Sequence, residues 1–228
     1  DACNAARGAD LVVFIGGLHK ADHQDAEGTD RESFDLPYGQ NKVVEALAKA
    51  NPRIVYVNIS GNAAHLSFVK QVPAIVQAWF NGSEAGEAIA SVLCGDANPS
   101  GKLPMTWNDN LDDYGAHALN TYPGTWRDDK KEIIDEVYEE GIYVGYRWND
   151  LKNIKPVFAF GHGLSYTTFQ MGNLRQSADT MTADGTMTFT VNVKNTGARA
   201  GAEVVQLYIS DTKASVDRPA KELKGFEK

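Results

Sequence analysis

The chain has 228 residues, of which 30 are acidic and 22 basic, and its formal net charge is −8. That charge works against binding a phosphate backbone, so no nucleic-acid partner is expected. No apolar run approaches the roughly 18 residues that a membrane helix needs, so no membrane partner is expected either. With 43% hydrophobic residues, the composition is typical of folded globular domains and excludes disordered or collagen-like chains.

Between residues 11 and 93, short β-branched apolar runs alternate with longer segments of helical period. The runs LVVFIGG (11–17), RIVYVNI (53–59) and AIVQAWF (74–80) are almost continuously apolar, which is typical of strands covered on both faces. Strands that alternate with helices indicate a parallel sheet between helical layers. The predicted fold class is therefore α/β, a three-layer α/β sandwich with a mostly parallel sheet.

Two segments have the pattern of amphipathic helices. QNKVVEALAKANP (40–52) gathers its apolar residues on one face and stops at a proline. SEAGEAIASVLCG (83–95) begins with Ser83 as a predicted cap and ends at a glycine. Its Cys94 and the distant Cys3 are too few for a disulfide framework, and we expect both to pack as small hydrophobes.

After Phe169 the pattern changes to period two. MTFTVNVKNTG (187–197) and AEVVQLYIS (202–210) alternate apolar and polar residues, which predicts an antiparallel hairpin in a second domain. An immunoglobulin-type sandwich needs about 100 residues, and only 57 remain from Gly172 to Lys228. We therefore predict an incomplete β-sandwich, whose residues after Gly172 are disordered, paired with a neighbouring copy or completed by another fragment.

The segment 17–37 is the anomalous connection, because strand-to-helix loops usually have two to six residues. Ligands of open α/β sheets bind at the loops that follow the strands. Glu27 stands beside Gly28, which lets the backbone pass close to a ligand, and near Arg31. A carboxylate desolvated there by a partner surface holds its proton more tightly and suits general acid catalysis. The alternative is a solvated acidic loop, formed by Asp22, Asp25, Glu27, Asp30 and Glu32.

Cofactor chemistry fits the sequence less well. Neither GxGxxG nor GxxxxGK[ST] occurs, so no nucleotide cofactor is expected. His19 and His23, with Asp22 and Asp25, could supply metal ligands. Their spacing brings two imidazoles together only on a helix, however, and this stretch has the pattern of a loop. We expect a solvated polar loop and no metal.

A serine hydrolase is also a weak hypothesis. Ser60 follows a strand, but the GxSxG pattern is missing, and Ser60 to Asn62 is equally typical of a turn. The other histidines, His65, His117 and His162, are scattered singly. Isolated histidines are more often hydrogen-bonded structural residues than catalysts.

Longer motifs run through nearly the whole chain in order. They are AEGTDRESFDLPYGQ (26–40), VYVNISGN, VQAWFNGSEAGEAIASVLCGDANPSGKLPMTW (76–107), YEEGIYVGYRW (138–148), FAFGHGLSYTTF (158–169) and VKNTGARAGAEVVQLYISD, followed by RPAKELKGF. With these motifs the chain resembles the carboxy-terminal region of glycoside hydrolase family 3, the β-glucosidase and β-xylosidase family.

The resemblance implies a domain organisation. Family members combine an amino-terminal barrel, an α/β sandwich and often a fibronectin type III-like domain. Residues 1–169 look like the α/β sandwich, and residues 170–228 look like the start of the fibronectin type III-like domain, truncated after LKGF. The barrel of the parent chain would be the partner domain. Family habit favours a periplasmic or extracellular location.

The implied function is retaining hydrolysis of a β-linked glucoside or oligosaccharide. In such enzymes a barrel aspartate is the nucleophile and a glutamate from a sandwich loop is the acid/base, and Glu27 of AEGTDR matches that glutamate. Many relatives have a Ser-Gly or similar pair before it, where this chain has Asp25-Ala26, so Asp25 and Glu32 stay alternatives. His19, Lys20 and His23 are expected on the leaving-group side of the cleft.

Because the nucleophile would lie in the barrel, we expect this chain by itself to be inactive. A hypothesis from another class remains open at this point. The chain could be a non-catalytic carbohydrate-binding or structural module whose loop merely resembles an active-site segment.

Overall fold

The first part of the chain forms an α/β layer structure. The computed structural model describes residues 1–21 and 23–228. In chain order the first elements are α1 (Ala2–Arg7), β1 (Val12–Gly17), the 3-10 helix η1 (Pro37–Gly39), α2 (Gln40–Ala50), β2 (Ile54–Ile59), β3 (Ala74–Gln77) and α3 (Ala85–Cys94). The predicted strands and helices of this part are confirmed, with shorter ends.

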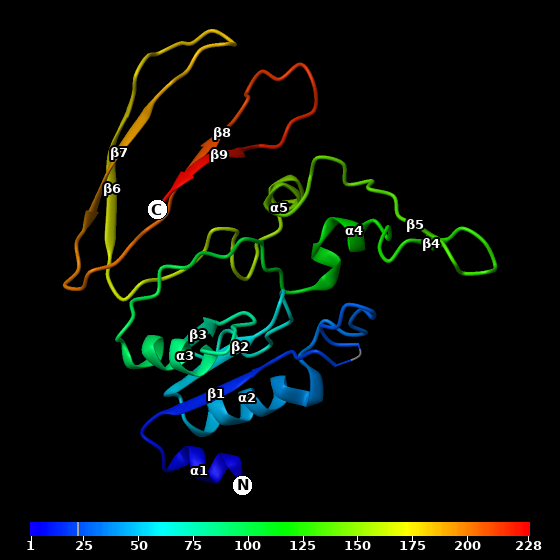
Figure 1. The fold of residues 1–228 in the computed structure, drawn as a ribbon, viewed down its shortest axis with the longest axis vertical. Helices are drawn as coiled ribbons and strands as arrows, with labels where there is room; N and C mark the ends of the chain where they lie inside the picture. Colours follow the sequence, from blue (N-terminus) through cyan, green and yellow to red (C-terminus); the bar gives the residue numbers. More distant parts are fainter. Residues whose placement is uncertain (22) are drawn as a thin grey trace.

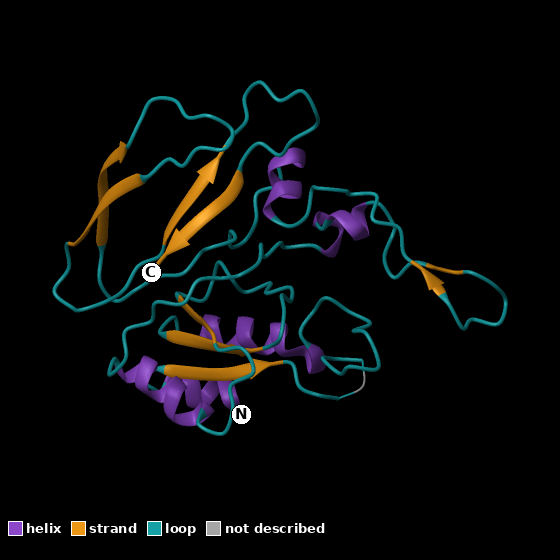
Figure 2. Cartoon of the chain, turned by 45° about the horizontal axis from the view of Figure 1, so that its top comes forward, coloured by secondary structure: helices purple, strands orange, loops and turns teal. Residues whose placement is uncertain are grey.

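The three strands form one parallel sheet in the order β1-β2-β3. Val12 lies opposite Ile54, and Val55 lies opposite Ala74. Helices lie on both sides of the sheet (Figure 2), as expected for a three-layer sandwich. Since the strands are parallel, the loops that follow them meet at one edge, which points to the right in Figure 1.

The main core lies between α2 and the sheet. Tyr56 of β2 is fully buried, stacks on Phe14 of β1 and meets Phe68 edge-on, with 4.7 Å between the last two ring centroids. Val44 and Leu47 of α2 belong to the same cluster. Full burial of such a side chain contributes about 1.5–3 kcal/mol, so this cluster fixes α2 on the sheet.

The outer face of β1 differs from the sequence prediction. Val13 and Ile15 are 43% and 56% exposed, although β1 was expected to be covered on both faces. The strand alternates buried and exposed side chains because only its α2 side packs on the core. The helix α3 follows β3, at the opposite edge of the sheet from β1 (Figure 1).

Two details of α3 correct the prediction. The helix begins at Ala85, so Glu84 rather than Ser83 takes the cap position, and no side chain caps it. Gly95 ends the helix in the left-handed conformation, as predicted. Cys94 is exposed because it lies on the solvent side of the last turn, whereas Cys3 is partly buried against the core.

The middle of the chain is mostly irregular. Its short elements are η2 (Leu111–Asp113), α4 (Gly115–Ala118), β4 (Thr125–Trp126), β5 (Ile134–Asp135) and α5 (Tyr146–Lys152). β4 and β5 pair antiparallel and extend away from the rest of the molecule (Figures 1 and 2). Within the described ranges, no helix has both the length and the apolar character that crossing a bilayer requires.

The last part contains two separate two-stranded antiparallel sheets, which form an incomplete β-sandwich (Figure 1). β6 (Phe169–Gln176) pairs with β7 (Phe189–Asn195), and β8 (Val205–Ile209) pairs with β9 (Glu222–Glu227). The predicted hairpin between the strands now labelled β7 and β8 is therefore wrong. Period-two alternation identifies a strand but not its partner. The long connection between β7 and β8 carries the chain from one sheet to the other.

The β-sandwich part is tied to the middle of the chain by polar contacts. Lys102 Nζ lies 2.6 Å from Glu203 Oε1, with both side chains mostly buried. The backbone N–H of Leu223 donates to the Tyr146 hydroxyl at 2.9 Å. The segment after Gly172 contains the strands β7, β8 and β9 and most of β6 rather than a disordered tail, so that alternative is wrong. Pairing with another copy or fragment, and the domain boundary at 169/170, stay predictions.

Candidate active site at the carboxyl edge of the sheet

The loops that follow the three parallel strands converge on one place. Asp25, in the long loop after β1, accepts a hydrogen bond through Oδ2 from the N–H of Gly61 at 2.9 Å. Gly61 follows β2 and packs so closely on Phe80, which follows β3, that an added Cβ would lie 3.1 Å from the ring. The strand-end argument from the sequence is thus matched by direct contacts between these loops.

A buried polar network lies beneath the loops. Asn58 is fully buried, and its Nδ2 donates to Ser60 Oγ at 2.8 Å and to Gln77 Oε1 at 2.7 Å. Asn58 Oδ1 accepts from the Tyr56 hydroxyl at 2.9 Å. Ser60 Oγ in turn donates to the carbonyl of Asn62. These bonds fix the ends of β2 and β3 and make Ser60 a structural residue, as the turn interpretation expected.

The start of the long loop is fixed by Gly17 and Gln40. The Gln40 side chain accepts from the Gly17 N–H and donates to the Gly17 carbonyl, each at 2.8 Å. Gly17 has a φ of 127°, and a Cβ there would meet the Ile59 carbonyl oxygen at 2.0 Å. Only glycine suits this combination of backbone angle and close approach, so the direction in which the loop leaves the sheet is set here.

The middle of the loop is anchored on both sides of Glu27. On one side Asp25 holds Gly61. On the other side Arg31 Nη2 donates to the Ala63 carbonyl at 2.7 Å, and the Tyr122 hydroxyl donates to Asp30 Oδ2 at 2.6 Å. The hydrogen bond to Asp30 raises the pKa of Tyr122 to about 12. Burial lowers the pKa of Arg31 from its usual value, while nearby Asp25 acts in the opposite direction.

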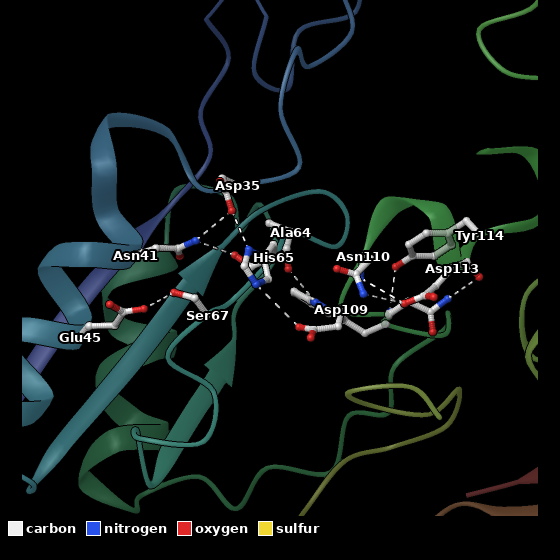
Figure 3. A network of polar contacts seen from close by, with 12 residues as sticks. Asp35, Asn41, Glu45, Ala64, His65, Ser67, Asp109, Asn110, Asp113 and Tyr114 are labelled. Atoms are coloured by element: carbon white, nitrogen blue, oxygen red, sulfur yellow. Dashed lines mark hydrogen bonds and ion pairs between the residues drawn. The ribbon is translucent and has the colours of Figure 1, made fainter. Parts of the chain in front are cut away.

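A second polar cluster closes the base of the loop (Figure 3). His65 Nδ1 lies 2.6 Å from Asp35 Oδ1, and its Nε2 lies 3.8 Å from Asp109 Oδ1. Asn41 of α2 bonds both the Asp35 carboxylate and the His65 carbonyl. The N–H of His65 also bonds the Phe34 carbonyl. His65 is thus a hydrogen-bonded structural residue that joins the loop to the segment after β2.

Glu27 itself is exposed at the tip of a tight turn. Ala26 and Thr29 form an antiparallel bridge, which leaves Glu27 and Gly28 as the two residues of the turn. Hydrogen bonds at Asp25 and Asp30 hold the turn that carries Glu27 on both sides. Glu27 is thus an exposed carboxylate in the loop that follows β1.

Two of the other predicted loop residues contact different partners within the loop and at its end. His19 stacks on Tyr38, and its Nε2 lies 3.0 Å from the Tyr38 hydroxyl. Lys20 is exposed. His23 Nδ1 lies 3.5 Å from the exposed carboxylate of Glu32, the alternative acid/base. Asp22, considered above as a possible metal ligand, lies outside the described residues.

The described part of the chain bears on the metal hypothesis and on the contacts of the isolated histidines. There, no group of three or more His, Cys, Asp and Glu side chains is arranged to hold a metal ion. His117 packs edge-on against Tyr122, and His162 stacks on Phe158. Both contacts fit the structural role expected for isolated histidines.

An open, largely apolar cavity of about 550 Å³ lies next to the anchored loop. It is lined by Arg31 and Phe34 of the loop and by Tyr114, Tyr146 and Phe160 from the middle of the chain, among others. The cavity therefore lies between the α/β layers and the segment 104–160.

Sequence reasoning missed most of the supports of Glu27. Tyr122 is 92 positions from Asp30, and neither residue stands in a motif that predicts their contact. Asn58 and Gln77 lie inside strands, where polar residues on buried positions are the available signal. Two amides within otherwise apolar runs indicate that a buried polar network exists there. They do not indicate which side chains bond to one another.

The comparisons with known proteins decide the family. A family model described as the glycosyl hydrolase family 3 C-terminal domain matches residues 1–146, and a fibronectin type III-like domain model matches residues 203–228. The chain belongs to glycosyl hydrolase family 3. The resemblance drawn from the sequence motifs is thereby confirmed.

Family 3 relatives match the chain along its entire length. The chain is 49% identical over 230 residues to a β-glucosidase of Bacteroides ovatus. The match covers 100% of this chain and 30% of that protein. It is 41% identical to a thermostable β-glucosidase of Acetivibrio thermocellus, of which it covers 29%. A crystal structure of the Kluyveromyces marxianus β-glucosidase with glucose shares 41% identity and a TM-score of 0.84, over 99% of this chain and 26% of that one. The chain therefore spans about 30% or less of these family 3 enzymes.

Proposed function

We propose that the chain is the carboxy-terminal part of a retaining β-glucosidase and that Glu27 is its acid/base. The observation that carries the proposal is the placement of Glu27, exposed on a turn that Asp25 and Asp30 anchor, at the edge where α/β sheets bind ligands. The names of the relatives support the reaction class, since each is a β-glucosidase.

The chemistry needs two carboxyl groups about 5–5.5 Å apart, on opposite sides of the scissile bond. In the first step a nucleophilic carboxylate, supplied by a barrel domain outside residues 1–228, attacks the anomeric carbon. Protonated Glu27 gives its proton to the departing glycosidic oxygen, and a covalent glycosyl-enzyme forms. In the second step ionised Glu27 takes a proton from water, whose oxygen displaces the enzyme carboxylate and releases the sugar.

The loop anchors support this role through orientation. A general acid must lie within hydrogen-bond reach of the oxygen that it protonates. The contacts of Asp25, Asp30 and Arg31 restrict the turn, so the position of Glu27 relative to the sheet is set before substrate binds. His19, Lys20 and His23 are proposed for the leaving-group side, because they are exposed in the same loop.

The test replaces Glu27 by alanine and by glutamine in the full-length polypeptide that contains these residues. With an alkyl or unactivated aryl glucoside, turnover should fall by roughly 10²–10⁴-fold, the usual contribution of general acid–base catalysis. With a dinitrophenyl glucoside, whose leaving group needs no proton, the Ala variant should still form the glycosyl-enzyme. Added azide should then attack its anomeric carbon, restore turnover and give a β-glycosyl azide.

Matched controls are Asp25→Ala and Glu32→Ala, which truncate the two alternative carboxylates of the same loop. Neither should show azide rescue. Normal turnover of the Glu27 variants, or rescue in a Glu32 variant instead, would refute the assignment. The isolated chain should hydrolyse neither substrate, and unaided cleavage would show that the nucleophile is not supplied from outside it.

A further inference from the structure

The loop between β3 and α3 contains an asparagine followed by a glycine. Asn81 and Gly82 are both exposed, and the sequence has no other Asn-Gly pair. Asparagine is among the chemically labile residues. A glycine after it has no side chain to screen its backbone nitrogen, and it turns at little steric cost. The pair therefore has the sequence that most favours attack of the backbone nitrogen on the asparagine side chain.

The structure leaves this pair free to react. Within the described residues, neither the Asn81 side chain nor the Gly82 N–H takes part in a hydrogen bond. Only the Gly82 carbonyl is engaged, by the N–H of Ala85 at 3.1 Å. A Cβ built on Gly82 would meet nothing within 4 Å, so the space beside its backbone is open. The pair can change conformation without breaking a strand ladder or a helix.

Other asparagines of the chain lack this combination. Asn4 is exposed and is followed by the small Ala5, but the Ala5 N–H donates to the Asp1 carbonyl at 3.2 Å in α1. The Asn4 side chain also accepts a hydrogen bond from Arg7. Asn58 is fully buried, and its amide is bonded on both sides. Asn81 thus differs from them in exposure, in its glycine neighbour and in its unbonded backbone N–H.

We propose that Asn81 is a site of spontaneous deamidation. The Gly82 nitrogen gives its proton to hydroxide and attacks Cγ of Asn81. A C–N bond closes a five-membered cyclic imide, while the bond from Cγ to Nδ2 breaks and ammonia leaves. Water then opens the imide at Cγ to give aspartate, or at the backbone carbonyl to give isoaspartate. One water is consumed, one ammonia is released, and nothing is oxidised or reduced.

The change falls beside a contact of the candidate site. Phe80, directly before Asn81, packs on Gly61, whose N–H donates to Asp25 in the loop of Glu27. Isoaspartate lengthens the backbone by one atom at this point, and either product adds a negative charge to a chain whose net charge is already −8. The modification does not depend on the proposed function, since it needs only water and the exposed loop.

The test is ageing of the full-length polypeptide at neutral and mildly alkaline pH, followed by peptide mapping with mass spectrometry. We expect the peptide that contains Asn81 to gain about one dalton and to separate into aspartate and isoaspartate forms. It should react at least fivefold faster than the peptide that contains Asn4. The rate should rise in proportion to hydroxide concentration, because the nitrogen attacks after losing its proton.

The matched variant is Gly82→Ala, in which a methyl group crowds the attacking nitrogen. Deamidation at Asn81 should slow at least fivefold, while the fold should persist because the added Cβ meets nothing within 4 Å. A synthetic peptide of residues 78–88 gives the rate of the same sequence without the fold. We expect the folded polypeptide to react within about fivefold of this peptide.

Four results would overturn the proposal. They are no mass gain at Asn81, a product that contains aspartate without isoaspartate, a rate that Gly82→Ala leaves unchanged, and a folded polypeptide that reacts much more slowly than the peptide. The last result would show that the fold protects the pair. The readout is the mass of a peptide, so it is independent of glucosidase activity and of the role of Glu27.

Discussion

Replacing Asn58 by alanine should lower the free energy of unfolding by roughly 2–6 kcal/mol. Its amide is fully buried and is the partner of the Tyr56 hydroxyl and of Gln77 Oε1. The substitution leaves the buried Tyr56 hydroxyl and the partly buried Gln77 Oε1 without that partner. A buried group left without its partner costs about 1–3 kcal/mol. Ser60 Oγ loses less, because Gln77 Nε2 also bonds it, at 3.2 Å.

The assay is urea unfolding of the 228-residue chain, followed by tryptophan fluorescence and circular dichroism. The control is Asn62→Ala, in which an exposed asparagine of the next loop loses its side chain while its carbonyl still accepts from Ser60. We expect the control to change stability by less than about 0.5 kcal/mol, as is usual for surface substitutions.

A double-mutant cycle with Gln77→Ala separates the network from simple loss of packing. If the two amides act as one unit, their coupling energy should be about 0.5–3 kcal/mol. A loss below about 1 kcal/mol for Asn58→Ala, or additive effects in the cycle, would refute the view that this network holds the strand ends.

Two further predictions concern the frame around the site. Gly17→Ala should destabilise the chain by about 1–3 kcal/mol through backbone strain and a clash with the Ile59 carbonyl. The control Gly82→Ala should be near neutral, because a Cβ there meets nothing within 4 Å. Equal urea midpoints for the two variants would contradict this prediction. For Glu203, burial alone would raise the pKa, but the bonds from Lys102 and the Val204 N–H hold it below the usual value of 4.5. A carboxyl with a lowered folded pKa adds stability that is present above pH 4.5 and lost as the pH falls through the lowered value. Glu203→Gln should therefore flatten the decline of the urea midpoint below pH 4.5. The control Glu132→Gln changes an exposed carboxylate and should leave this pH dependence unchanged. If Glu203→Gln also leaves it unchanged, the ion pair with Lys102 does not contribute as proposed.

Local pattern was sufficient where burial follows directly from the chain. The apolar runs of β1, β2 and β3 and the amphipathic face of α2 occur where they were predicted, because burying such runs requires regular backbone hydrogen bonding. The long polar loop after β1 was also evident from its length. Its position at the carboxyl edge followed from the parallel arrangement.

Pattern was insufficient where a partner had to be chosen. The strands β7 and β8 were expected to pair with each other, yet each pairs with a different neighbour. The alternation in β8 reports which side chains are apolar, and it is the same whichever strand lies beside it. The irregular strand β6 was not predicted, because FQMGNLRQ lacks the alternation of a half-buried strand.

The sequence alone determined the layered α/β class, the family resemblance and the candidate Glu27, because each depends on the order of residues along the chain. Tertiary structure decided how that glutamate is held. Asp25 meets Gly61 only after the parallel strands have brought their following loops to one end of the sheet, and Tyr122 meets Asp30 only after the segment that follows α4 has packed beside that loop. Contacts between residues 36 and 92 positions apart depend on the packing of whole elements, and no local pattern encodes them.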